Sequence, residues 1–139
     1  MSDCLFCGIV AGEVESSRVY EDAHVVAFMD IRPVTRGHTL VVPRRHAAYL
    51  GELDPEDGAH VFRASMAVAA AIRRSPIRSE GVNLHLADGE AAGQDVFHVH
   101  LHVLPRFAGD GFGLRFPPDY RVRERAELDE AADLIRSAL

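Results

Sequence analysis

His98, His100 and His102 alternate with apolar residues in a valine- and leucine-rich segment over residues 96–104. Side chains of a strand point alternately to its two faces, so the three imidazoles are expected on one face and the apolar side chains in the core. The outer two histidines of such a strand lie roughly 13 Å apart, too far for one metal ion with ligand bonds of about 2 Å to hold all three. The pattern predicts separate roles: one histidine as ligand, the middle one as nucleophile, and the last as an acid or phosphate donor. The alternative is three surface histidines on a half-exposed strand.

Cys4 and Cys7 have the C-x-x-C spacing of a metal half-site or of a redox pair. They can supply two of the four ligands of a zinc ion, and the sequence contains no second C-x-x-C. Two cysteines in a chain of this length do not form a disulfide framework. A tetrahedral site would therefore need two further ligands from elsewhere in the chain.

The 139-residue chain carries 21 acidic and 15 basic residues, for a formal net charge of −6, and every basic residue is arginine. The absence of lysine excludes a phosphate-binding loop of the G-x-x-x-x-G-K type, a pyridoxal Schiff base and a protein kinase. The arginines are scattered in an acidic chain, so nucleic acid is not an expected partner. Apolar runs are too short for a membrane span and the N-terminus lacks a signal-peptide profile, so we expect a cytoplasmic protein with no membrane partner.

A long helix is predicted over residues 55–75. Asp54 followed by Pro55 is a strong helix start, and apolar residues then recur at helical spacing. Phe62 and Met66 fall on one apolar stripe of this helix, and we expect both in the core. A second stripe, beside it, carries Val61, Ser65, Val68 and Ile72.

The length predicts one domain over residues 1–139, with residues 107–139 as a C-terminal loop and helix. Runs of β-branched residues between turn residues predict strands over residues 18–21, 24–29, 38–42, 81–87 and 96–104, the third of them stopped by Pro43. Shorter helices are expected over residues 6–11 and 121–139. Together these elements predict an α+β fold with a mainly antiparallel five-stranded sheet, one long helix and shorter helices.

The histidine alternation resembles the signature of the histidine triad (HIT) superfamily of nucleotide hydrolases and transferases. Residues 4–10, 28–33, 37–46 and 91–97 also resemble segments of that family, in the same order along the chain. The N-terminal cysteine pair is similar to that of small bacterial-type members of the Hint-like branch. The resemblance runs from Cys4 to Arg106 and implies the HIT-like fold.

The resemblance implies that His100 is the nucleophile. It would attack the α-phosphorus of a nucleoside 5′-phosphate conjugate, such as an AMP phosphoramidate, form a covalent nucleotidyl-histidine, and release the nucleoside monophosphate. His102 would contact the phosphate and help to protonate the leaving group, and His38 would complete the polar network behind the triad. The alternative for His38 is an ordinary strand histidine.

The resemblance also implies a nucleotide-binding set. Asp30 would accept hydrogen bonds from the ribose hydroxyls, although it could instead form the turn before Pro33. The base would lie in an apolar slot and the phosphate near a glycine-containing loop, although apolar residues are more often core and Gln94 could be a loop amide satisfied by the backbone. The expected slot residues are Phe6, Phe28 and Ile31, and the expected phosphate or leaving-group contacts are Gly93, Gln94, Asp95 and Asn83.

Family members with the N-terminal cysteine pair imply a closed, structural zinc site. Its ligands here would be Cys4, Cys7, His46 and His98, which also gives His98 a role among the catalytic histidines. The alternatives are two thiols in the core or a redox pair. The family further implies a homodimer that pairs through the long helix and a sheet edge.

Two positions depart from the family pattern: Asp95 places an acid near the expected phosphate, and Ala87 lacks an expected polar contact. The resemblance implies a purine nucleoside phosphoramidase-like hydrolase, and the presence of His38, His98, His100 and His102 favours an enzyme. The alternatives are a diadenosine polyphosphate hydrolase, or a nucleotide-binding interaction module with negligible turnover. His24, His60 and His85 have no expected role.

Overall fold

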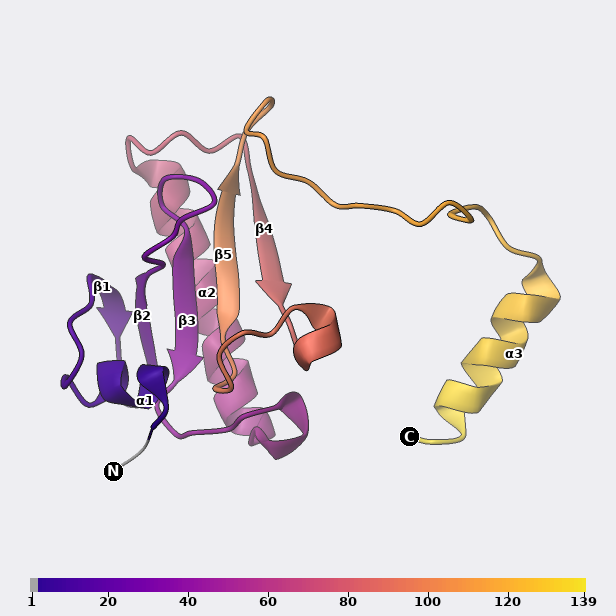
Figure 1. Ribbon diagram of the computed structural model, residues 1–139, viewed down its shortest axis with the longest axis horizontal. Coiled ribbons are helices and arrows are strands. Elements are labelled where there is room, and N and C mark those ends of the chain that lie inside the picture. The colour runs from indigo at the N-terminus through magenta and orange to yellow at the C-terminus, as the bar shows by residue number, and fades with distance from the viewer. Residues whose placement is uncertain (1–2) are drawn as a thin grey trace.

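The computed structural model of the protein describes residues 3–139. Within this range, five strands form one antiparallel sheet in the order β1-β2-β3-β5-β4. Figure 1 shows the long helix α2 lying across this sheet. The fold is therefore α+β with an antiparallel five-stranded sheet, as the sequence predicts. The strands are β1 (Arg18–Glu21), β2 (Val25–Met29), β3 (Thr39–Pro43), β4 (Gly81–Leu86) and β5 (Leu101–Arg106).

Each face of the sheet has its own core. On one face, valines of the central strands pack against the buried residues of α2 (Pro55–Arg74). On the other face, Phe28 and Leu40 pack against Phe6 and Ile9 of the short helix α1 (Leu5–Val10). Because successive side chains of a strand point to opposite faces, both faces of β2 and β3 are buried, which explains their continuous apolar sequence.

Helix α2 begins as the sequence predicts, since the Asp54 carboxylate accepts a hydrogen bond from the Glu56 amide at 2.9 Å. The expectation that Phe62 and Met66 lie in the core is wrong: they are 52% and 58% exposed. The helix carries two apolar stripes, and the sheet covers only the one that contains Val61 and Val68.

The strand predicted over residues 96–104 starts later in the chain and is shorter than predicted. β5 begins at Leu101, and residues 96–100 are not paired as a strand. Instead, the Val99 amide donates to the Ala47 carbonyl at 2.7 Å, in the loop after β3. β3 ends at Pro43, one residue beyond the predicted range, and a proline at the last position of the strand needs no amide donor.

The C-terminal segment leaves the body of the protein. Arg106, at the end of β5, forms an ion pair with Asp110 at 2.6 Å, and the chain then runs outward to α3 (Arg125–Arg136). Figure 1 shows α3 standing apart from the sheet, and the apolar side chains of Leu134 and Ile135 are 69% and 66% exposed. The helix is shorter than the predicted 121–139. Two single 3₁₀ turns, η1 (Leu50–Glu52) and η2 (Glu90–Ala92), lie in connecting loops.

No helix in the described part of the chain has both the length and the apolarity that a membrane crossing requires.

The turn between β1 and β2 is held by one carboxylate. Asp22 accepts hydrogen bonds from the amides of His24 and Val25 and from the Tyr20 hydroxyl, at 2.7 to 2.9 Å. Burial alone would raise the pKa of Asp22, but these three donors lower it to about 2.

We expect Asp22→Ala to lower the free energy of unfolding by about 1–2 kcal/mol at neutral pH, since three donors lose their acceptor. A carboxyl whose pKa is depressed in the folded state stabilises above its unfolded pKa, and that contribution is lost as the pH falls toward about 2. Denaturant unfolding of both proteins at pH 7 and at pH 2.5 to 4 measures this. The difference between the proteins should shrink on acidification, and a constant difference would contradict the assignment.

Candidate active site and metal-ligand cluster

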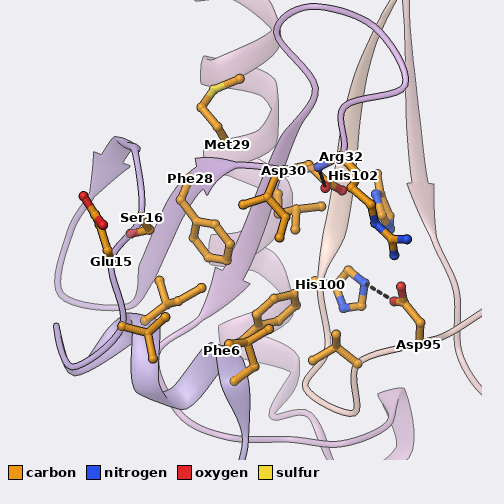
Figure 2. Close-up of a pocket in the computed structure, with 16 residues that line it drawn as sticks. Phe6, Glu15, Ser16, Phe28, Met29, Asp30, Arg32, Asp95, His100 and His102 are labelled. Atoms are coloured by element: carbon orange, nitrogen blue, oxygen red, sulfur yellow. Dashed lines mark hydrogen bonds and ion pairs between the residues drawn. The ribbon is translucent and has the colours of Figure 1, made fainter.

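A cavity of about 240 Å³ opens between α1, β2 and the histidine segment. Its walls are apolar, with Phe6 and Phe28 meeting edge to face at 5.4 Å. Figure 2 shows these two rings on one side of His100 and Asp95 on the other side. The polar groups that line the cavity include Asp30, Arg32, Asp95, His100 and His102. The cavity therefore joins a slot for a flat apolar group to a cluster of hydrogen-bonding groups.

Strand pairing sets the order of these groups across the sheet. Phe28 of β2 pairs with Leu40 of β3, and Leu40 pairs with His102 of β5. Directly paired residues of antiparallel strands point to the same face, so these three form a row on the face that carries α1. The row places the apolar slot and the histidines side by side.

His100 is held in one tautomer by the backbone. Its Nδ1 lies 2.8 Å from the His98 carbonyl oxygen, and a carbonyl can only accept, so Nδ1 carries the proton. The neutral ring therefore presents the lone pair of Nε2. The ring is 2% exposed and packs against the edge of Phe6 at 5.1 Å. A buried imidazole with a fixed lone pair can act as a nucleophile without being ionised.

Asp95 lies beside that nucleophilic nitrogen. Its Oδ1 is 3.8 Å from His100 Nε2, and Figure 2 shows the carboxylate turned toward the ring. The side chain is largely exposed to solvent. The acid that departs from the expected pattern at this position therefore faces His100 Nε2.

A second chain of hydrogen bonds fixes the tautomer of His102. The Val34 amide donates to His38 Nδ1 at 3.1 Å, so His38 carries its proton on Nε2. That nitrogen donates to His102 Nδ1 at 2.9 Å, which leaves the His102 proton on Nε2. His102 thus presents an N–H donor, whereas His100 presents a lone pair.

His102 is neutral at physiological pH. Burial lowers the pKa of His102 to about 4, and the neighbouring histidines His100, His38 and His85 act in the same direction. Burial also lowers the pKa of His38, against the opposing effect of the Asp30 carboxylate. Both rings therefore act as hydrogen-bonding groups rather than as cations.

Asp30 lies at the polar end of the cavity. One carboxylate oxygen accepts from the Arg32 amide at 2.8 Å, and the other lies 3.5 Å from His38 Nε2. The carboxylate keeps acceptor positions open toward the cavity, which suits a pair of hydroxyl groups. Ile31 lines the cavity but is 91% exposed, so it lies at the rim.

The structure places three further predicted residues outside the cavity. Gln94 is buried and its amide serves the backbone: it accepts from the Gly89 amide and donates to two carbonyl oxygens. Gly93 adopts a φ of 95° after a single 3₁₀ turn, a conformation that favours glycine. Asn83 accepts from Arg106 at 2.6 Å, on the edge strand.

Sequence reasoning gave no role to Arg32, which lines the cavity, or to the Val34 amide and the Pro43 carbonyl. For Arg32, the only signal in the sequence is its position two residues after Asp30. Backbone groups carry no residue-type signal at all.

Four potential metal ligands converge near the N-terminus: Cys4, Cys7, His46 and His98. Both sulfur atoms lie 3.4 Å from His98 Nδ1, and Cys7 Sγ lies 3.3 Å from His46 Nδ1. The two Nδ1 atoms are 3.2 Å apart. These are the four ligands that the sequence resemblance implies, and His102 belongs to a different cluster, with Asp30 and His38.

The donor distances fit a tetrahedral zinc ion. Zinc bonds of about 2.3 Å to sulfur and 2.0 Å to nitrogen place neighbouring donors roughly 3.3 to 3.8 Å apart in a tetrahedron. His98 Nε2 donates to the Pro43 carbonyl at 2.8 Å, so the lone pair of Nδ1 points into the cluster. Two sulfurs and two imidazole nitrogens form a closed set, with no position left for a substrate.

Comparison with known proteins agrees with this geometry. A family model described as the HIT domain matches residues 11–109. A HIT family protein from Bacillus anthracis is similar in structure, with a TM-score of 0.91 and 40% identity over 99% of this chain and 98% of that one. A Zn-bound histidine triad family protein from Mycobacterium smegmatis has a TM-score of 0.77 and 41% identity, over 99% and 98% of the two chains. A histidine triad nucleotide-binding protein from Candida albicans has a TM-score of 0.87 and 26% identity, over 98% and 96%.

Protein purified without a chelator is expected to contain about one zinc ion per chain, because the four donors match a closed zinc site. Cys7→Ser should lose most of this metal, while His60→Ala, which changes a histidine outside the cluster, should retain it. Elemental analysis of folded protein measures both. Well under one zinc per chain in the unmodified protein, or unchanged zinc in Cys7→Ser, would contradict the assignment.

The hydrogen bonds predict three defined tautomers, which long-range ¹H–¹⁵N spectra of histidine-labelled protein report directly. His100 should carry its proton on Nδ1, and His38 and His102 should carry theirs on Nε2. Because burial lowers the pKa of His102 to about 4, its signals should not titrate between pH 5.5 and 8. A His100 proton on Nε2, or a His102 that titrates near neutrality, would exclude the geometry described above.

Proposed function

The chain belongs to the HIT family, and from its site we propose that it is a nucleotide hydrolase that cleaves at the α-phosphate of a nucleoside 5′-phosphate conjugate. The preferred substrate class is an AMP phosphoramidate or a similar conjugate. The observation that carries the proposal is the hydrogen bond from His100 Nδ1 to the His98 carbonyl, since it leaves His100 Nε2 available as a nucleophile. The nucleotide-binding relative from Candida albicans supports the ligand class.

The row of residues across the sheet supports a binding mode for the nucleotide. The base would lie in the apolar slot that Phe6 and Phe28 help to line, with Ile31 at its rim. The ribose hydroxyls would donate to the Asp30 carboxylate, and the α-phosphate would then lie at His100 and His102. The buried Gln94 would act indirectly, by holding the loop before the histidines in place.

The reaction would take two displacements at phosphorus. In the first, His100 Nε2 forms a bond to the α-phosphorus while the bond to the leaving nitrogen or oxygen breaks, and that atom takes up a proton. In the second, water attacks phosphorus, the bond to His100 breaks, and one water proton is released. The proton taken up in the first step equals the one released in the second, so the cycle is balanced with water as the only co-substrate.

Two neighbouring groups would assist these steps. His102, neutral and with its proton on Nε2, donates a hydrogen bond to a phosphoryl oxygen as negative charge develops there. Asp95 lies 3.8 Å from His100 Nε2, where its carboxylate can accept the proton of the attacking water in the second step. The acid at this position would thus contribute to turnover of the intermediate.

Zinc would have a structural role. The closed set of donors fits it, and the Zn-bound relative from Mycobacterium smegmatis supports the metal. When bound, zinc would tie the N-terminal helix to His98, the residue whose carbonyl orients the nucleophile. The catalytic steps would use His100, His102, their hydrogen-bond partners and Asp95, with no step on the metal.

The two other functions remain second candidates. A diadenosine polyphosphate hydrolase would use the same row of residues with a nucleotide as leaving group. A nucleotide-binding interaction module would bind through Asp30 and the slot but would not turn over. The oriented lone pair of His100 favours an enzyme over a module.

We further propose a cytoplasmic homodimer in which the whole chain, residues 1–139, forms one domain and residues 107–139 form its C-terminal loop and helix. The exposed Phe62 and Met66 of α2 support a partner on that face, because both apolar side chains lack cover in the single chain.

The wild-type protein should release AMP from a model AMP phosphoramidate, and His100→Ala should reduce kcat at least 10³-fold because the nucleophile is lost. AMP release is measured by chromatography at saturating substrate. His60→Ala serves as the matched control, since it removes a histidine outside the cavity, and should stay within about twofold of wild type.

Release of AMP by His100→Ala at the wild-type rate would exclude the covalent mechanism. Absence of release by wild-type protein, together with tight AMP binding, would favour the interaction module. Faster turnover of diadenosine polyphosphates than of phosphoramidates would favour the second hydrolase.

A further inference from the structure

His85 extends the row of residues that crosses the site. It lies on the edge strand β4 and pairs directly with His102 of β5. The row on the α1 face of the sheet is therefore Phe28, Leu40, His102 and His85, one residue from each of four neighbouring strands. The two imidazole rings are 5.6 Å apart between centroids.

The row assigns a direction to the bound conjugate. Neighbouring strands lie about 4.8 Å apart, so His102 stands between the apolar slot on one side and His85 on the other. A nucleotide with its base at Phe28 and its α-phosphate at His102 points its leaving group toward β4. His85 does not line the nucleoside cavity, so it stands beyond the phosphate position.

The surroundings of His85 leave its ring available to a ligand. The ring contacts His102 but forms no hydrogen bond within residues 3–139, and the residue is exposed. The neighbouring polar groups on this face are already paired: Asn83 accepts from Arg106, and Arg106 is held by Asp110. His85 is thus the exposed donor next to the phosphate position on this strand.

Resting on the function proposed above, we propose that His85 forms a leaving-group subsite that binds an oxyanion directly beyond the scissile bond, the carboxylate of an amino-acid amine or a second phosphate. His85 would donate a hydrogen bond to that oxyanion and so raise kcat/KM for conjugates that carry it. Its role is substrate selection rather than chemistry at phosphorus.

Charge makes such a donor useful here. The chain has a net charge of −6 and no lysine, and Asp95 and Asp30 both lie in the cavity. An anionic leaving group therefore meets a repulsive field unless a local donor offsets it. Arg32, which lines the cavity, and His85, which pairs with His102 from β4, can supply that compensation.

The test compares two nearly isosteric substrates, the AMP phosphoramidates of glycine and of glycinamide, in wild type and in His85→Leu. Leucine keeps bulk and suits a strand, so the fold should persist. His85→Leu should lower kcat/KM about five- to tenfold for the glycine conjugate and at most about twofold for the glycinamide conjugate. His85→Gln, which keeps a donor, should recover part of the selectivity.

A binding comparison tests whether the bound oxyanion is a second phosphate, and it does not depend on turnover. Calorimetry of AMP and ADP with wild type and His85→Leu should show a loss of affinity for ADP of about fivefold and no change for AMP. His24→Leu, which removes an exposed histidine from the β1–β2 turn, should change neither ratio. An effect on glycine conjugates alone assigns a carboxylate subsite, and an effect on ADP alone assigns a phosphate subsite.

The proposal would be overturned if His85→Leu lowered kcat/KM equally for both conjugates and lowered the affinity for AMP and ADP equally. This result would show that His85 only supports His102. Unchanged ratios in both experiments would overturn the proposal as well. Failure of the proposed function would look different: wild type would release no AMP from any conjugate, and the AMP and ADP affinities would still decide whether the subsite exists.

Discussion

The hydrogen bond between His100 Nδ1 and the His98 carbonyl constrains the whole site. It requires that the backbone leave regular strand pairing just before Leu101, because a carbonyl engaged in a ladder would not turn toward the next histidine ring. The Val99 amide bonds to the Ala47 carbonyl instead, and this holds the irregular segment against the loop after β3. Two backbone contacts thus convert an ordinary histidine into one with a defined tautomer.

The same segment joins the metal-ligand cluster to His100 and His102, the proposed catalytic groups. His98 donates to the Pro43 carbonyl through Nε2 and faces the cysteines through Nδ1, so its ring is fixed from both sides. Its own carbonyl then fixes His100. The ring of His98 thus belongs to the metal-ligand cluster while its backbone orients His100, so the proposed structural and catalytic roles would be divided within one residue. On the far side of the site, His38 and His102 are neutral and aligned, because burial disfavours their charged forms.

The order of elements could be predicted because it depends on local pattern, whereas most of the candidate site residues were indicated by the resemblance to a known family, and Gly93, Gln94 and Asn83 lie outside the cavity. β-branched runs bounded by turns placed the strands, and the alternation at residues 98–102 placed the histidines. The late start of β5 could not be predicted, because it depends on hydrogen bonds to the carbonyls of Pro43 and Ala47, which lie about fifty residues earlier in the chain. The exposure of Phe62 could not be predicted either, because two stripes of α2 are apolar and only the position of the sheet decides which one is buried. The hydrogen-bond partners of Gln94 are backbone groups, and these cannot be recognised from the types of the residues that carry them.

The central claim is that His100 Nε2 attacks phosphorus and becomes covalently nucleotidylated. The most direct measurement is rapid acid-free quenching of wild-type protein mixed with an AMP phosphoramidate, followed by digestion and mass spectrometry under conditions that preserve phosphorus–nitrogen bonds. The proposed mechanism requires one AMP group on the peptide that contains His100, formed before free AMP accumulates and located on the imidazole by fragmentation. AMP produced in a burst with no modified peptide, or with the AMP group on His102 or His98, would contradict it.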